Sequence, residues 1–548
     1  MRWILIALAL GACDGVIDDP PAVMERDPRI PPDTPRVGEL VPIAPTVRRL
    51  TRDEYLFTIL DVTGVALSDE DARDLPVDRP LEGFVNISTG QTALPDHVRA
   101  YSELAELIVS EAAFATFLSD TVSCADTSDS CAAMVAEDVG RLLFRRPLEE
   151  RETTAFTALF ASVRDEGEDF DRAARAVAQA MLQSPPFLYL IEREVVATDE
   201  EREERVRTVG GYEMASRLSY MLWGSAPDEE LYRAAENGDL DGPGNLRREV
   251  ERMLGDTDKV RRVTRRYMID WARMESLPDD DGLKGDLIDT AVAFYQNAAA
   301  RGEDLFALFE TQSAHLTPEL AEAYGLTPQG EGVQEYDLTD APGRQGILGQ
   351  PGVLAGMTNA DGGAIVARGL FMQAQLFCRE TPDPPASLQE EIDEFVAEQP
   401  ENASDRQIAE TRLMRTSCAQ CHGQFDPLAY GLEAFDFRGT FRSEDEHGNT
   451  VRSDGWIPAV FNLERVQQPY EDFEGLMSLL AQNTDVSHCW MLRQSEYALG
   501  QRVHELQEEI VGEIADAVRE DGGDQEALVR NLVAHDLFRV IQLEDPNE

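Results

Sequence analysis

The stretch Cys418-Ala419-Gln420-Cys421-His422 has the spacing C-x-x-C-H, which is the attachment sequence of a c-type haem. Two thiols separated by two residues can each form a thioether with one haem vinyl group. The histidine that follows is then held under the iron as its proximal ligand. The spacing therefore predicts covalent haem c on Cys418 and Cys421, with His422 as the iron ligand.

Other uses of a C-x-x-C pair are half of a zinc site, a redox dithiol or a structural thiol pair. A zinc site needs two further ligands, and the sequence has no second C-x-x-C and no H-x-x-x-H. A thioredoxin-like dithiol needs a βαβ context, and none is visible around this segment. Because c-type haem is attached outside the cytoplasm, an export signal favours the haem.

The chain begins with the pattern of such a signal. One arginine precedes the apolar run Trp3–Leu10, which is too short to span a bilayer, since a span takes about 20 residues. Leu10-Gly11-Ala12-Cys13 resembles a bacterial lipobox. We expect residues 1–12 to be a lipoprotein signal peptide, with Cys13 lipidated as the only membrane anchor of an exported protein in the periplasm or outer membrane. The alternative is an ordinary signal peptide with Cys13 as a free thiol.

Residues 13–46 are rich in proline and acidic residues, which favours an extended tether between anchor and body. The remaining chain is long enough for two to four domains. The formal net charge of the full chain, -55, excludes nucleic acid and anionic lipid as partners, because both would be repelled. The acid either maintains solubility or attracts a basic redox partner in the envelope.

The remaining cysteines fall into two pairs. Cys124 and Cys131 flank a short polar loop and are expected to form a local disulfide in an oxidising compartment. Cys378 and Cys489 either pair with each other, linking the haem segment to the C-terminal helices, or stay separate. No other apolar stretch reaches transmembrane length.

The fold class is predicted to be mainly α, a multi-segment helical body with a C-terminal c-type cytochrome-like helical segment. Thr51 and Glu54 form a capping-box pattern before a helical apolar period. The run from Tyr212 to Trp223 predicts an apolar helix that ends at Gly224.

Other segments lack a clear helical period. Residues 194–207 form a charged run, expected as an exposed helix or linker. Residues 343–369 are dense in glycine, which permits tight turns and close backbone approach. Asp426-Pro427 is expected to close a turn after the haem helix.

Several of these stretches together resemble a known family. They are LTRDEYLFTILDVTGV from Leu50, LLFRRPLEERE from Leu142, the Tyr212–Trp223 helix, Arg368-Gly369, the C-x-x-C-H segment and SEYALG from Ser495. In this order they resemble the cytochrome-associated proteins of planctomycetes and myxobacteria, which consist of consecutive domains of unknown function.

The resemblance implies five domains after the tether. These are residues 47–115 (DUF1587-like), 116–195 (DUF1595-like), 205–335 (DUF1592-like), 340–445 (DUF1588-like, Gly-rich and haem-bearing) and 446–548 (DUF1585-like). Relatives often carry an additional N-terminal cytochrome domain. This sequence has one C-x-x-C-H stretch, so one haem is expected.

The sixth iron ligand has no motif. Met477, Met357, His447 and His488 are the candidates, and Arg438 or Arg442 are candidates to pair with haem propionates. The expected function is single-electron transfer in the cell envelope. The alternatives are a peroxidase-like haem enzyme with an open distal site, and a surface scaffold or binding protein in which haem is structural or absent.

Overall fold

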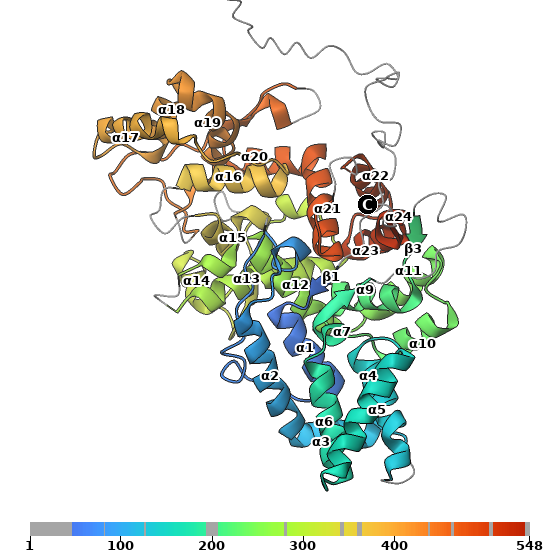
Figure 1. The fold of residues 1–548 in the computed structure, drawn as a ribbon. Coiled ribbons are helices and arrows are strands. Elements are labelled where there is room, and N and C mark those ends of the chain that lie inside the picture. Colours follow the sequence, from blue (N-terminus) through green and yellow to red (C-terminus); the bar gives the residue numbers. More distant parts are fainter. Residues whose placement is uncertain are drawn as a thin grey trace, which may run out of the picture.

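Helices form most of the chain in a computed structural model (Figure 1). The structure describes residues 47–542 except 82, 125–127, 193–205, 279–281, 340–344, 359–363, 437–438, 462–464 and 504–507. The expected signal peptide, the lipidated Cys13 and the tether of residues 13–46 lie outside the described residues. The mainly α fold class is confirmed.

The N-terminal helices enclose a hydrophobic core of their own. α1 begins with the predicted capping box, in which Thr51 accepts from the Glu54 backbone and Glu54 accepts from that of Thr51. Leu50 and Tyr55, on either side of this cap, are fully buried. The helices are α1 (Arg52–Thr63), α2 (Pro95–Ser110), α3 (Ala112–Thr121), α4 (Ala132–Leu143), α5 (Glu150–Asp165), α6 (Phe170–Leu182) and α7 (Pro185–Leu188).

A second, larger core is shared by the middle and the end of the chain. The predicted helix before Gly224 is present as α9, and Gly224 ends it with a φ of 62°. The middle elements are α9 (Gly211–Trp223), α10 (Glu229–Asn237), α11 (Pro243–Leu254), α12 (Thr257–Trp271), α13 (Lys284–Ala300), β4 (Ser313–Leu316), α14 (Pro318–Ala323) and β5 (Gln334–Asp337).

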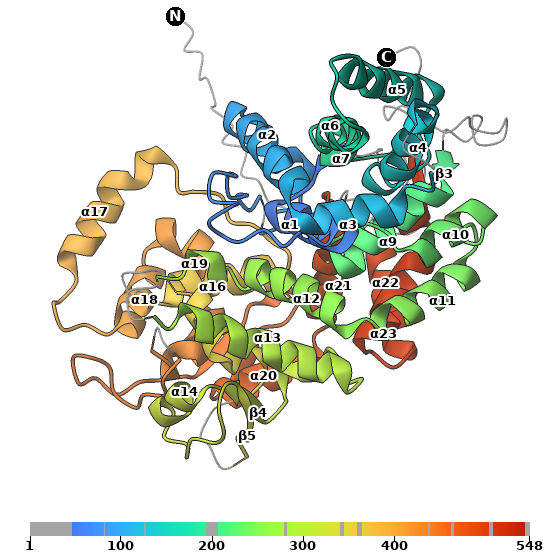
Figure 2. The same ribbon diagram turned by 90° about the horizontal axis from the view of Figure 1, so that it is seen from below.

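The helices α17, α18 and α19 lie together at one end of the molecule, opposite α2–α6 (Figure 1), and α17 lies at its edge (Figure 2). This part contains α15 (Pro351–Gly356), α16 (Ala364–Leu376), α17 (Gln389–Glu398), α18 (Asp405–Leu413) and α19 (Thr416–Ala429). The chain ends with β6 (Gly455–Ile457), β7 (Gln468–Tyr470), α20 (Phe473–Gln482), α21 (Thr484–Leu499), α22 (Glu508–Glu520), α23 (Gln525–Ala534), α24 (Asp536–Arg539) and β8 (Val540–Gln542).

Short antiparallel strand pairs join distant segments. β1 (Val47–Arg49) pairs with β2 (Tyr189–Ile191), and β3 (Val206–Thr208) pairs with β8 at the other end of the chain. The prediction of an exposed helix or linker over residues 194–207 is therefore wrong at its C-terminal end, because Arg207 lies in β3 and is only 2% exposed. Its partner strand lies more than 300 residues away in sequence, so no local pattern could indicate the pairing.

The glycine-rich stretch is also more helical than its composition indicates, since α15 and the start of α16 lie in it. Here glycine serves close packing between elements. A Cβ atom on Gly352 would lie 2.0 Å from the Leu287 carbonyl oxygen, and one on Gly356 would lie 1.9 Å from that of Ala272. The helices α15 and α13 can therefore approach backbone to backbone.

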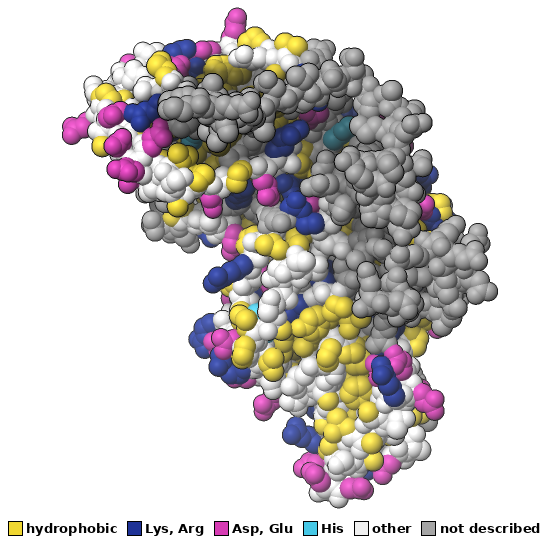
Figure 3. All heavy atoms as spheres, turned by 45° about the horizontal axis from the view of Figure 1, so that its top comes forward, with side chains coloured by type: hydrophobic (Ala, Val, Ile, Leu, Met, Phe, Trp, Pro, Cys, Tyr) yellow, Lys and Arg dark blue, Asp and Glu magenta, His cyan; other side chains and the backbone are white. Residues whose placement is uncertain are grey.

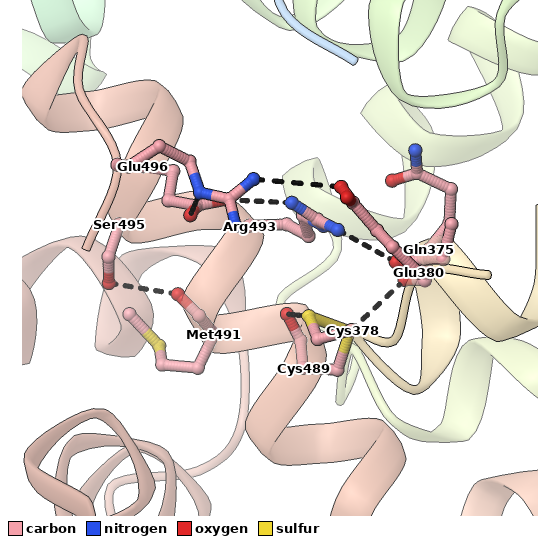
Figure 4. The surroundings of a disulfide bond; sticks show 10 residues. Gln375, Cys378, Glu380, Cys489, Met491, Arg493, Ser495 and Glu496 are labelled. Atoms are coloured by element: carbon pink, nitrogen blue, oxygen red, sulfur yellow. Dashed lines mark hydrogen bonds and ion pairs between the residues drawn. A yellow bond between two sulfur atoms is a disulfide. The ribbon is translucent and has the colours of Figure 1, made fainter. Parts of the chain in front are cut away.

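The described residues contain two disulfides. One joins Cys124 to Cys131, and the other joins Cys378, just after α16, to Cys489 in α21. Around the second bond, Arg493 donates to the Ala374 carbonyl and to Glu496, at 2.8 Å each (Figure 4). This bond and these contacts fasten the end of α16 to α21.

The chain is acidic, with 104 Asp and Glu residues against 49 Lys and Arg. On the face drawn in Figure 3, Asp and Glu side chains are scattered among Lys and Arg. Within the described residues, no helix is both long enough and apolar enough to cross a membrane.

Candidate functional site

Cys418, Cys421 and His422 lie in α19. Residues three and four apart share one face of a helix, so the C-x-x-C-H spacing places both thiols and the imidazole on the same side. Cys418 is half-buried and Cys421 is exposed, while the His422 side chain is 25% exposed. The three groups are thus held at the surface of a helix whose following turns are buried.

Asp426 lies one turn after His422 and is fully buried. Its Oδ1 atom is 3.1 Å from His422 Nδ1, and its Oδ2 atom accepts from Arg412 of α18 at 2.6 Å. His422 Nδ1 therefore faces this carboxylate, and Nε2 is the ring nitrogen that does not contact Asp426. A buried carboxylate behind the ring is the arrangement that orients a metal-binding histidine.

The expected turn at Asp426-Pro427 was wrong, because both residues lie inside α19. Proline removes one helical hydrogen bond, but the buried side chains of Phe425 and Leu428 and the ion pair of Asp426 outweigh that loss. The Pro427 carbonyl in turn accepts from the Tyr470 hydroxyl at 2.6 Å.

α19 packs directly on α16. A Cβ atom on Gly369 would lie 2.4 Å from the Phe425 carbonyl oxygen, so only glycine permits this approach. The neighbouring Arg368 is fully buried and donates to the carbonyls of Leu432 and Phe435, at 2.6 and 3.0 Å. Burial lowers the pKa of Arg368 to about 10, with Glu433 opposing that change. The Arg368-Gly369 pair is thus an anchor for the segment that follows α19.

The two thiols of α19 differ from the other cysteines that the structure describes. Those four are paired in disulfides, whereas Cys418 and Cys421 are both free. Among the described residues, no group of three or more His, Cys, Asp or Glu side chains is arranged to hold a metal ion by itself. Two free thiols, an accessible Nε2 and a buried carboxylate behind it fit a covalently attached haem c better than a zinc site.

The candidates for the sixth ligand lie elsewhere. Met357 and Met477 are buried in the larger core. His447 lines a polar pocket beside Arg442, and His488 lies near Asp516. In the described part of the chain, no hydrogen bond, ion pair or ring contact joins any of the four to Cys418, Cys421 or His422.

Of the two candidates for the haem propionates, Arg442 donates to the Glu433 carbonyl at 3.2 Å and lies 3.8 Å from the Glu433 carboxylate. The other candidate, Arg438, lies outside the described residues. Sequence reasoning missed one other residue of the site. Asp426 was interpreted as part of a turn, although its four-residue spacing from His422 is the signal of a pair on one helix face.

Five family models match the chain, each described as a protein of unknown function. In chain order they are DUF1587 (residues 48–114), DUF1595 (131–192), DUF1592 (209–326), DUF1588 (344–445) and DUF1585 (467–538). The DUF1588 model, which contains the C-x-x-C-H segment, bears the name PSCyt3, a cytochrome-associated label. No curated protein and no solved structure matches the chain. Because all five domains are present in the expected order, the chain belongs to the multidomain proteins built from the series DUF1587, DUF1595, DUF1592, DUF1588 and DUF1585.

Proposed function

We propose that this protein is an exported c-type monohaem protein that transfers single electrons in the cell envelope. The observation that carries the proposal is the shared face of α19, with two free thiols and His422 backed by buried Asp426. Cys418 and Cys421 would hold the haem, and His422 Nε2 would bind its iron. When bound, haem supplies a reversible one-electron couple.

The residues around the site have separate tasks in this proposal. Asp426 fixes the direction of the His422 ring, and the ion pair with Arg412 holds Asp426 in place. The exposure of Cys421 supports an attachment site at the surface. A redox partner then exchanges electrons there without entering the protein.

The side chains beside the site favour a basic partner. Ser417 donates to Glu391 of α17, and the exposed acidic residues Asp393, Glu394 and Glu398 lie on the same helix. Carboxylates around an exposed redox site attract a positively charged protein and raise its association rate. The proposed lipid anchor at Cys13 would keep both proteins near the same membrane.

The peroxidase-like alternative differs from the electron carrier in the sixth position of the iron, which would be open. A low-spin spectrum supports the electron carrier, and a high-spin spectrum with peroxide turnover supports the enzyme.

The test is the mass and absorption spectrum of the protein purified from a host that matures c-type haem. We expect one added haem that survives acid-acetone extraction. Cys418→Ala should remove this extraction-resistant haem. The double variant Cys124→Ala/Cys131→Ala is the matched control, because it removes two thiols that form a disulfide elsewhere. A wild-type polypeptide without added haem mass overturns the redox proposal and leaves the scaffold alternative.

A further inference from the structure

A cavity of about 100 Å³ lies where the N-terminal helices meet α9, α12 and the end of α21. We call it the junction cavity. Its wall includes side chains from the DUF1587, DUF1595, DUF1592 and DUF1585 matches, represented by Glu54, Arg145, Tyr220 and Tyr497. Ligand sites occur preferentially at such domain interfaces.

The residues that line the junction cavity come from the stretches on which the family resemblance rests. Thr51 and Glu54 belong to LTRDEY, Arg145 and Arg146 to LLFRRPLEERE, and Tyr497 to SEYALG. Two hydrogen bonds join SEYALG to residues 86–88 of the DUF1587 match. The Ser88 amide donates to the Gly500 carbonyl at 2.8 Å, and the Asn86 amide group donates to the Tyr497 carbonyl at 2.7 Å.

Charges on the cavity wall are balanced except at one residue. The carboxylates of the wall are each paired with an arginine, namely Asp53, Glu54, Glu192 and Glu213. Five of the six arginines on the wall hold a described carboxylate in return, namely Arg48, Arg146, Arg217, Arg262 and Arg266. Arg145 is the exception, since no carboxylate of the described residues forms an ion pair with it.

Arg145 is held in a demanding position. It is 3% exposed and has a φ of 59°, in the left-handed region that non-glycine residues rarely adopt. Its guanidinium donates to the carbonyls of Pro186 and Tyr189, at 2.7 and 2.8 Å, and lies 5.6 Å from the centre of the Tyr220 ring. The carbonyl groups satisfy the N–H groups of Arg145 but leave its full positive charge at the cavity wall. Residues with a strained backbone of this kind occur at ligand-binding sites.

One phenol adds a neutral hydrogen-bond donor. The Tyr220 hydroxyl already accepts from Arg145 at 3.3 Å and bonds to Thr58 at 3.0 Å, whereas the Tyr497 hydroxyl forms no hydrogen bond with the described residues. Burial raises the pKa of both hydroxyls, so they stay protonated. The rings of Phe57 and Phe144 complete an aromatic wall, and the Asn86 Oδ1 atom is buried without a hydrogen-bond partner among the described atoms.

We propose that the junction cavity binds a small aromatic or similarly flat apolar molecule that carries one carboxylate. The unbalanced charge of Arg145 selects the anion, the Tyr497 hydroxyl donates to it, and the aromatic wall covers the apolar part. This site is independent of haem attachment, because its residues lie outside the DUF1588 domain. It also gives a physical reason for four domains to act as one unit, since no single domain forms the cavity.

The test uses benzoate and its uncharged analogue benzamide as probes, with the full-length protein in a titration calorimeter. We expect saturable binding of benzoate at least tenfold tighter than that of benzamide. Tyr497→Phe keeps the ring but removes the donor, and should weaken benzoate about tenfold and benzamide less, because a charged carboxylate accepts a stronger hydrogen bond than an amide carbonyl.

Ser216→Leu places a larger side chain into the cavity wall and should abolish binding of both probes. Ser162→Leu, the same change at an exposed position of α5, is the matched control and should bind as the wild type does. Circular dichroism establishes that each variant is folded. Absence of benzoate binding, equal binding of benzamide, or unchanged benzoate affinity in Ser216→Leu or Tyr497→Phe overturns the proposal.

Discussion

His422 Nδ1 lies 3.1 Å from Asp426 Oδ1, one turn further along the same helix, and Asp426 is itself fixed by Arg412. The pair leaves Nε2 as the ring nitrogen that does not contact Asp426. A sequence motif for haem attachment thus coincides with a buried carboxylate in the position that makes a histidine a directed, electron-rich ligand.

We expect Asp426→Asn to raise the reduction potential of the attached haem. A neutral amide accepts a weaker hydrogen bond from Nδ1, so the imidazole donates less electron density and the ferric state is less stabilised. A redox titration measures the change. Covalent haem content should stay the same, because the thiols are intact. Asp393→Asn on α17 is the control, and an equal shift there would indicate a general charge effect.

Gly369→Ala should destabilise the packing of α19 on α16 by about 1–3 kcal/mol, because the new Cβ atom would overlap the Phe425 carbonyl. Gly423→Ala is a matched substitution within α19, where an added Cβ atom meets nothing within 4 Å. It should stabilise the helix by about 0.5–1 kcal/mol. Thermal unfolding of both variants measures the two changes in stability. A Gly369→Ala variant that is as stable as Gly423→Ala would refute the close approach of α19 and α16.

Removing the Cys378–Cys489 disulfide should cost more stability than removing Cys124–Cys131. The two bonds close sequence separations of 111 and 7 residues. Loop-closure entropy then gives losses of about 4–5 and about 2 kcal/mol. Double alanine variants of each pair, unfolded by urea, provide the measurement. Equal losses would show that native contacts around Arg493 and Glu496, rather than chain entropy, dominate the larger effect.

Asp270 should make the protein less stable as pH rises from about 4 to 6. Burial raises the pKa of this carboxyl to about 6, although Arg266 opposes the change. The folded chain therefore binds the proton more tightly than the unfolded chain, and its advantage disappears as pH rises through that window. The stability of the wild type relative to Asp270→Asn should fall by about 2–3 kcal/mol.

Thermal midpoints of the two proteins at pH 4 to 7 measure this difference. Asp289→Asn changes an exposed carboxylate paired with Arg265 and is the control. Its difference from the wild type should stay constant over the same range. A constant difference for Asp270→Asn as well would contradict the effect of burial.

Local patterns in the sequence located many of the helices. The caps at Thr51 and Gly224 lie where the sequence predicts them, because a cap depends on residues within one turn of the helix end. The spacing of Cys418, Cys421 and His422 likewise needed only helical periodicity to place three groups on one face. The five-domain series was also recognisable from short motifs alone.

Only the tertiary structure decided how the glycines, Asp426 and the cavity residues are used. From sequence alone, the glycines near residue 352 indicate turns, but in the structure they allow close packing against α13. Asp426-Pro427 likewise indicates a helix end, but the ion pair with Arg412 and the burial of this turn keep α19 helical through both residues. The junction cavity joins Arg145 to Tyr497, and β3 joins β8, across hundreds of residues. The sequence by itself determined the helices and caps that depend on neighbouring residues. Burial and contacts between distant segments decided the rest, because these interactions contribute free energy only when the chain is packed.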